Sequence, residues 1–199
     1  MAHSLSDFKS TLTGGGARPN LFQVTLTFPT TITGYSKPSD FDKELKMLCK
    51  AANLPASNIA SIDVPFRGRI FKVAGDRTFD TWQITVINDT SFNLRTGMEE
   101  WMQYIGQYQD SSGVTKPADY MVTAQVDQLT RKPTDQGKTG TTGLSIQKSY
   151  IFYDIFPTNI SAIDLSYDTS DTIEEFTVEF QVQYWAPSTK ANTSTTPTI

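Results

Sequence analysis

Apolar and polar residues alternate along several segments of the chain, and this period of two is typical of strands with one buried face. The clearest example is 173–185, where Phe176, Val178, Phe180, Val182 and Tyr184 face one way. Burial of these side chains would contribute about 7–15 kcal/mol before the entropy cost is subtracted. Further strands are predicted at 21–28, 81–87 and 120–126, and at 150–156, which is apolar on both faces and ends at Pro157.

The region before the strand at 81–87 contains two interruptions. Gly75-Asp76 has the composition of a turn, so we expect the chain to reverse there and enter the strand of Trp82, Ile84 and Val86. Residues 62–73 are rich in β-forming residues but contain Pro65 and Gly68. Those two residues favour a bent edge strand or an extended hairpin over a central strand.

Helical spacing occurs in two places. Leu94, Met98 and Trp101 recur at intervals of three and four, which predicts an amphipathic helix over about 91–106. A shorter helix is predicted from Ser39, with Ser39 and Asp42 as a capping box, to about Ala52. A strand that reaches Cys49 is an alternative for the end of this segment.

These elements predict a mainly β fold, an antiparallel sandwich or barrel with a flanking α-helix. The chain has 199 residues, of which 38% are hydrophobic, as expected for one ordinary domain. We expect a flexible arm at 1–16, a single domain at 17–185 and a flexible tail at 186–199, with a mobile loop at 130–143. No apolar run has the length of a transmembrane helix, and no secretory signal is recognisable at the start.

Charge is unevenly distributed along the chain. The net charge is −4, yet seven acids and one base lie from Tyr150 onward. Such an acidic block is unsuited to gripping nucleic acid, because phosphate binding needs Lys and Arg; the simplest interpretation is a solvated acidic face. Bases cluster at Arg67, Arg69, Lys72 and Arg77. They form a solvated hairpin with local salt bridges or a contact surface for the acidic segment of another copy.

Residue types that support catalysis are scarce. His3 is the only histidine and Cys49 the only cysteine, so a Cys–His or Ser–His–Asp site and a thiolate or imidazole metal site are not expected. Gly137-Lys138-Thr139 imitates the end of a phosphate-binding loop, but Lys132 stands where that motif requires glycine. Asp164, Asp168 and Asp171 lack the spacing of a calcium loop. We therefore expect no cofactor and no enzymatic activity.

Six segments, in order, carry a resemblance to a known family. They are ARPNLFQV at 17–24, CKAANLPA at 49–56, VAGDRTFDTWQITVIND at 73–89, KPADY at 116–120, PTNI at 157–160 and the closing strand that ends in Tyr184-Trp185. Over about residues 17–185 the chain resembles the tail tube proteins of contractile-tailed, T-even-like bacteriophages. Each segment is weak alone, and the series is specific.

The resemblance implies a fold and an assembly. The fold is two packed antiparallel sheets with a helix at the side. The assembly is a hexameric ring with an inner β-barrel, stacked into a tube within a contractile sheath. The implied partners are further copies, the sheath protein, the baseplate tube-initiator and the tail terminator. Genomic DNA would pass through without specific binding. The implied location is the virion, after assembly in the host cytoplasm, with no membrane insertion by this chain alone.

Two site hypotheses follow from the resemblance together with the charges. Segment 64–77, with Arg67, Arg69, Lys72 and Arg77, is expected to reach a neighbouring subunit or ring. Glu175 or Glu179, on the polar face of the closing strand, is expected on the bore wall, where negative charge repels DNA phosphate. Segments 30–42, 130–143 and the tail after Trp185 are longer than the family core requires, so we expect them outside the bore.

Other functions remain open at this point. A tube subunit of a contractile injection or secretion system that carries protein cargo shares the fold, as does a baseplate tube-initiator, which usually carries extra domains. From a different class, a ligand-binding β-sandwich module would need aromatic residues on its polar sheet face. Trp82, Trp101 and Tyr184 lie on apolar stripes instead, which favours a place in the core.

Overall fold

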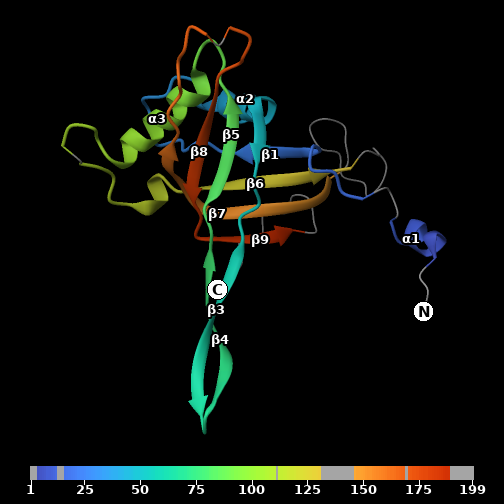
Figure 1. Cartoon of the computed structure of the whole chain (residues 1–199). Helices are drawn as coiled ribbons and strands as arrows, with labels where there is room; N and C mark the ends of the chain where they lie inside the picture. Colours follow the sequence, from blue (N-terminus) through green and yellow to red (C-terminus); the bar gives the residue numbers. More distant parts are fainter. Residues whose placement is uncertain (1–3, 13–15, 111, 131–145, 169, 189–199) are drawn as a thin grey trace. The chain divides into compact units, whose positions relative to one another are not determined.

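A computed structural model describes residues 4–12, 16–110, 112–130, 146–168 and 170–188 (Figure 1). The predicted loop at 130–143 and tail at 186–199 therefore lie largely outside the described residues. The chain divides into two compact units. The first contains residues 1–23, 126–149 and 187–199, and the second contains 24–125 and 150–186. Each unit is described by itself.

The described residues form a mainly β fold with two antiparallel sheets, as the alternation predicted. The strands are β1 (Phe22–Leu26), β2 (Cys49–Ala52), β3 (Ser57–Phe66), β4 (Arg69–Phe79), β5 (Trp82–Ile87), β6 (Val122–Leu129), β7 (Ile146–Ile160), β8 (Glu175–Gln181) and β9 (Tyr184–Ser188). One sheet has the order β1-β6-β7-β8-β5-β2, with β9 paired to β7, and β3 and β4 form the other. The α-helices are α1 (Leu5–Thr11), α2 (Pro38–Leu48) and α3 (Asn93–Ile105).

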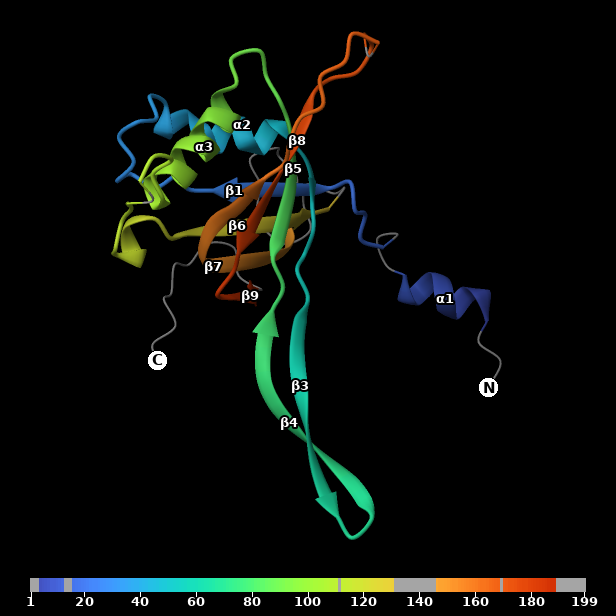
Figure 2. The ribbon, with the colours of Figure 1, turned by 60° about the vertical axis from the view of Figure 1, so that its left-hand side comes forward.

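The core of the second unit is centred on Trp82. Figures 1 and 2 show β5 and β8 crossing β7. The Trp82 ring stacks on Phe152 of β7 with 4.9 Å between centroids and lies 5.2 Å from Phe180 of β8. Ile84 and Val86 are buried beside it, so the predicted inner face of this strand is confirmed.

Helices α2 and α3 contribute to the same core. Phe41 and Leu45 of α2 are fully buried, as are Met98 and Trp101 of α3. The Trp101 indole Nε1 donates a hydrogen bond to the carbonyl oxygen of Tyr120 at 2.9 Å. Helix α3 confirms the helix predicted at 91–106.

The start and end of α2 differ from the prediction. The helix begins at Pro38 after Lys37 and has no side-chain cap, so the predicted capping box of Ser39 and Asp42 is wrong. It ends at Leu48, and Cys49 begins a strand instead of extending the helix to Ala52. Proline at the first helical position supplies a fixed φ, so the helix can begin there without the serine cap.

The first unit contains the ends of β1, β6 and β7. Gln128 of β6 donates hydrogen bonds from Nε2 to the carbonyl oxygens of Arg18 at 2.6 Å and Leu21 at 3.1 Å. Helix α1 is capped by Ser4 and Asp7 and has no buried residue. No hydrophobic pattern predicted this helix.

Three further predictions are corrected. Gly75-Asp76 lies inside β4 and makes no turn, because the chain reverses earlier, at Arg67-Gly68. Strand β7 continues past Pro157, where the pairing with β8 shifts register, and such an irregularity tolerates the missing N–H of proline. The strand predicted over 173–185 breaks after Gln181, and its last part pairs with β7 as β9.

Candidate assembly surface

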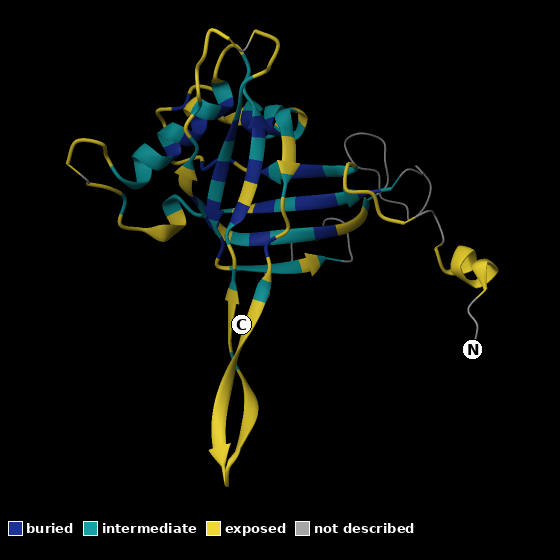
Figure 3. Cartoon of the chain, viewed as in Figure 1, coloured by how far each residue is buried: buried dark blue, intermediate teal, exposed yellow. Residues whose placement is uncertain are grey.

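The hairpin of β3 and β4 is the most exposed β structure among the described residues of the second unit (Figure 3). Its loop is Arg67-Gly68, with φ of 43° and 83°. Two successive residues with positive φ make the tight turn whose twist matches paired strands, and glycine adopts this conformation without steric cost. From this turn Phe66 pairs with Arg69, and the register continues to Ile62 opposite Val73.

The hairpin continues the ladder formed by β2 and β5. At the junction the Asn53 side-chain Oδ1 accepts a hydrogen bond from the Gln83 N–H at 2.8 Å, and the Asp80 N–H donates to the carbonyl oxygen of Ala56 at 3.1 Å. The Phe79 ring packs edge-on against Trp185, 6.2 Å between centroids. The hairpin therefore has an anchored base and a free tip.

One face of the hairpin carries an apolar stripe. Because directly paired residues project to the same face of a sheet, the register places five apolar side chains of the two strands on one side, while Ile70, opposite Pro65, projects from the other. This apolar stripe consists of Ile62, Val64, Phe66, Phe71 and Val73. Phe66 and Phe71 are each 66% exposed. A contiguous exposed apolar surface is typical of a protein contact.

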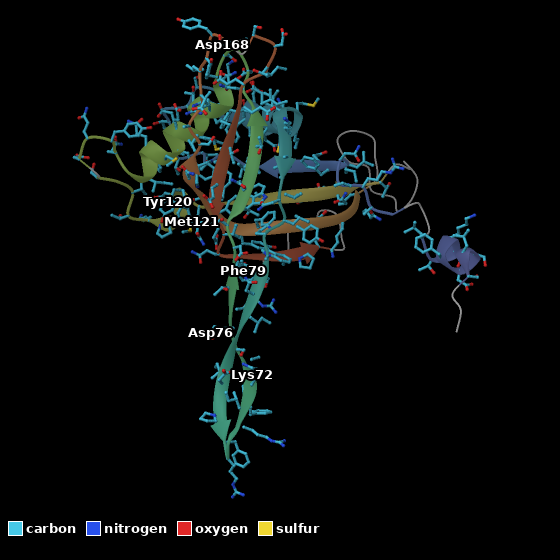
Figure 4. The ribbon with its side chains drawn as sticks, viewed as in Figure 1. Lys72, Asp76, Phe79, Tyr120, Met121 and Asp168 are labelled. Carbon is cyan, nitrogen blue, oxygen red and sulfur yellow. The ribbon has the colours of Figure 1, made fainter. Side chains whose placement is uncertain are left out.

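The four predicted basic residues all lie on the hairpin but not at one point. Arg67 is in the turn, and its guanidinium lies over the Phe66 ring, 5.5 Å from the centroid. Arg69 pairs with Phe66 on the face of the apolar stripe, whereas Lys72 pairs with Asp63 on the other face in a 2.7 Å salt bridge. Figure 4 shows Lys72 nearer the tip and Phe79 at the base. Arg77, opposite Ile59, is separated from the others by a register shift.

The two predicted acids lie on the face of β8 that points away from the core. Glu175 forms an ion pair with Lys50 of β2, with 2.5 Å between Oε1 and Nζ, so the negative charge of Glu175 is balanced by a lysine on another strand. Glu179 accepts a hydrogen bond from the Thr81 hydroxyl at 2.7 Å. Glu175 and Glu179 lie four residues apart on the same face of β8, with Thr177 between them.

The remaining chemistry of the described residues is limited. Within the described ranges no group of three or more His, Cys, Asp or Glu side chains is arranged to hold a metal ion. Burial raises the pKa of the Cys49 thiol to about 12, so it is a poor nucleophile at neutral pH. No helix in the part of the chain that is described is long and apolar enough to cross a membrane. His3 and 137–139 lie outside the described residues.

The aromatic residues weighed against a ligand platform divide into two groups. Trp82 and Trp101 are buried, as predicted. The prediction that Tyr184 belongs to the core is wrong. Its side chain is partly exposed, and its ring stacks on that of Tyr153 with 4.6 Å between centroids. The apolar alternation continues past Gln181, but the strand ends there, so Tyr184 falls on a different strand.

Sequence reasoning found the bases of the hairpin and missed its apolar stripe. Residues 62–66 and 69–73 both alternate around Arg67-Gly68, so the signal was present in the chain. Alternation alone does not distinguish a buried face from an exposed one. It shows that apolar side chains share one face of a strand, but it does not show whether another part of the protein covers that face.

Comparison with known proteins gives a consistent result. A family model described as "Phage tail tube protein" matches residues 17–188. The tail tube protein gp19 of Enterobacteria phage T4 is 34% identical over 173 residues, which cover 86% of this chain and 92% of that protein. The tail tube protein of Serratia phage KSP90 is 23% identical over 180 residues, covering 89% and 93%.

Solved structures show the same fold at lower identity. A chain of the sheath–tube complex of an extracellular contractile injection system, in its extended state, superposes with a TM-score of 0.60 at 11% identity, covering 94% of this chain and 99% of that one. A chain of the tube terminating cap of the anti-feeding prophage gives 0.59 at 16% identity, covering 88% and 92%. At these identities the likeness establishes the fold alone.

Proposed function

Because this chain belongs to the phage tail tube protein family, we propose that six copies of it close into a ring and that rings stack into the inner tube of a contractile tail. The chain is a structural protein of the virion, and we infer that it has no catalytic role. Residues 17–185 form the tube domain in this proposal. The observation that carries the proposal, within this family, is the exposed hairpin of β3 and β4.

The hairpin has the length and surface for contact between copies. At about 3.3 Å per residue a ten-residue strand such as β3 spans about 33 Å, enough to leave its own subunit. Its apolar stripe is exposed in a single chain and would be covered in an assembly. A head-to-tail contact closes into a ring only where its rotation allows it, and a second contact that does not close would join rings into a tube.

Charge favours passage of DNA through the tube without specific binding. We propose that the outer face of β8, with Glu175 and Glu179, lines the bore. Lys50 balances Glu175, which leaves Glu179 as the stronger source of negative potential. Carboxylates repel phosphate, so genomic DNA would slide without adhering. A high-resolution map of the tube with both residues distant from the bore would refute this assignment.

The other proposed partners follow from the assembly. The sheath protein would surround the tube, the baseplate tube-initiator would start it, and the tail terminator would end it. Assembly would take place in the cytoplasm of the host, without membrane insertion by this chain. The relatives that include a phage T4 protein at 34% identity favour a virion over an injection machine with protein cargo. Capsid genes beside its gene would agree with that choice, and their absence would favour the injection machine.

Electron microscopy of the purified full-length protein tests the proposal. Negative staining, with the protein alone and with baseplates, is expected to show long hollow tubes. A protein that stays monomeric even on baseplates would contradict the proposal.

Charge reversal tests the role of the hairpin. The double variant Arg67→Glu with Arg69→Glu should fold normally by circular dichroism and lose tubes, because both changes lie at the exposed tip. Lys43→Glu is the matched control, since its side chain is 76% exposed on α2 and should leave tubes intact. Normal tubes from the double variant would remove the hairpin from the contact.

A further inference from the structure

The hairpin of β3 and β4 is joined to the rest of its unit through two segments that are not strands. These segments are residues 53–56 and 80–81, which we call the junction. The hairpin is a separate two-stranded sheet, so no third strand among the described residues lies beside it to hold its direction. At about 3.3 Å per residue, a turn of about 10° at the junction would move the tip of the ten-residue strand β3 by about 6 Å. The contacts that hold the base therefore determine where the tip lies.

Backbone hydrogen bonds hold the junction within the plane of the hairpin. The Asn53 N–H donates to the carbonyl oxygen of Gln83 at 3.1 Å, and the Asp80 N–H donates to that of Ala56 at 3.1 Å. Hydrogen bonds of this kind join neighbouring antiparallel strands side by side and run perpendicular to them. They resist the separation of two strands more than the bending of the ribbon out of its plane. A contact from outside that plane is needed to fix the direction of the hairpin.

The side chain of Trp185 on β9 makes such a contact. Its ring packs edge-on against Phe79 of β4, with 6.2 Å between centroids, and against Tyr150 of β7, with 5.9 Å. Phe79 is labelled at the base of the hairpin in Figure 4, where it pairs with Ser57. Strands β7 and β9 belong to the larger sheet. One indole therefore connects the base of the hairpin to two strands of that sheet.

The two faces of β9 separate this contact from the neighbouring residue. Successive residues of a strand point to opposite faces, so Tyr184 and Trp185 project in opposite directions. Tyr184 stacks on Tyr153, whereas Trp185 packs on Tyr150. Strand β9 thus carries two large aromatic residues side by side, of which Trp185 is the one that faces the hairpin.

The ring of Trp185, and not its N–H, accounts for an aromatic residue at this position. The indole Nε1 is buried and has no hydrogen-bond partner among the described residues. A buried donor without an acceptor costs free energy, so the N–H does not stabilise the contact. The Trp101 indole, in contrast, donates to the carbonyl oxygen of Tyr120. A phenylalanine in place of Trp185 should therefore still hold the base of the hairpin.

Resting on the role of the hairpin proposed above, we propose that Trp185 is a positioning residue for tube assembly. Its ring holds the base of the hairpin against β7 and β9 and thereby fixes the direction in which the hairpin leaves its subunit. A hairpin with a fixed direction binds a neighbour without the entropy cost of ordering it on contact. The last strand of the fold thus sets the position of a surface formed by β3 and β4, far earlier in the chain.

Substitution of Trp185 tests this role in assembly. Trp185→Ala is expected to place about tenfold less protein in pelletable tubes than the unchanged chain, because an undirected hairpin must be ordered on binding. Trp185→Phe should assemble within about twofold of the unchanged chain, since it keeps a ring and loses only the unpaired N–H. Tyr184→Ala, on the other face of β9, is the matched control and should assemble normally. Normal tubes from Trp185→Ala, or equal losses from the alanine and phenylalanine variants, would overturn the proposal.

The hairpin side of the contact supplies a second variant. Phe79→Ala removes the same ring contact and should lower the yield of tubes as much as Trp185→Ala does. The double variant should be no worse than either single variant, because both changes act through one contact. Losses that multiply in the double variant would show that the two rings act independently and would refute the proposal.

A distance measurement on unassembled subunits separates positioning from stability. Spin labels at Phe71→Cys in the hairpin and Met47→Cys in α2, both exposed positions, report the direction of the hairpin in a Cys49→Ser background. The distance distribution should be narrow in the unchanged chain and in Trp185→Phe. It should be about twofold broader in Trp185→Ala, because a two-stranded ribbon without this contact moves about its junction. Equal widths in subunits that are folded by circular dichroism would contradict the proposal.

The distance measurement needs no tubes, so its outcome is independent of the proposed function. An unchanged chain that forms no tubes would refute the function, whereas tubes from the unchanged chain with equal widths in all variants would refute only the role of Trp185.

Discussion

The core half of the second unit, β5 and β8, and its hairpin half, β3 and β4, have the same residue pattern and opposite environments. Along β5 and β8 the large apolar residues are buried, and Trp82, Ile84 and Phe180 are each almost inaccessible. Along β3 and β4, which precede β5 in the chain and form a separate two-stranded sheet, residues of similar size are exposed. Alternation thus identifies a face that needs covering, and only the tertiary structure shows whether the cover is the same chain or another copy.

The sharpest test of this comparison removes one large side chain from each half. Trp82→Ala should lower the free energy of unfolding by about 3–5 kcal/mol, because its ring packs between Phe152 and Phe180. Phe71→Ala should change it by less than about 0.5 kcal/mol in unassembled subunits, since the ring is 66% exposed. Urea unfolding followed by circular dichroism measures both. Equal losses would mean that the hairpin belongs to the core of the single chain.

Thiol reactivity separates the two halves in a different way. Burial raises the pKa of Cys49 at the start of β2 to about 12. Alkylation at pH 8 should be at least about a hundredfold slower than for Phe71→Cys in a Cys49→Ser background, because the thiolate is the reactive form. Since the folded pKa exceeds the unfolded value, this group's contribution to stability is complete below about pH 9 and is lost as pH rises towards 12. Comparable rates at the two positions would contradict a protected Cys49.

A smaller substitution examines how tightly the core half is packed. A Cβ at Gly97 in α3 would lie 2.9 Å from Cε2 of the buried Phe41 ring. Gly97→Ala should therefore destabilise the subunit by about 1 kcal/mol, as overpacking exceeds the gain in helix propensity. Gly106→Ala is the control, because nothing lies within 4 Å of its Cβ position, and its thermal midpoint should stay unchanged. A stabilised Gly97→Ala variant would show that the packing around Phe41 accommodates the additional methyl group without strain.

The smallest effect is expected from ion pairs. Lys50–Glu175 on the core half has side chains 55% and 31% exposed, and Lys72–Asp63 on the hairpin has 66% and 50%. Double-mutant cycles should give a coupling below about 1 kcal/mol for each, and the smaller value for the hairpin pair, which water screens more. A larger coupling energy for the Lys72–Asp63 pair would contradict the expectation that the more exposed ion pair is the weaker one.

Much of the fold could be predicted from the sequence, because strands with one buried face have a clear period. The strands around Val24, Ile84 and Ala124 and the helix around Met98 were all predicted and are present. The family was also predictable, from six segments in the correct order. These features depend on local pattern and on similarity, both of which are visible in one chain.

The predictions that were wrong concern features that local pattern does not encode. The break after Gln181 leaves the alternation intact, and Pro157 is accommodated at a shift in register. Gly75-Asp76 has turn composition but is extended, because Arg67-Gly68 already reverses the chain. Of the candidate surface, the bases of the hairpin were recognised from charge, whereas its apolar stripe depends on which side chains the fold leaves uncovered.

A high-resolution cryo-electron microscopy map of assembled tubes tests the central claim most directly, namely that the β3–β4 hairpin is a surface for contact between copies. The account predicts that Phe66 and Phe71 of every copy are buried against a neighbouring copy. A map in which the hairpins project into solvent, with Phe66 and Phe71 uncovered, would contradict it.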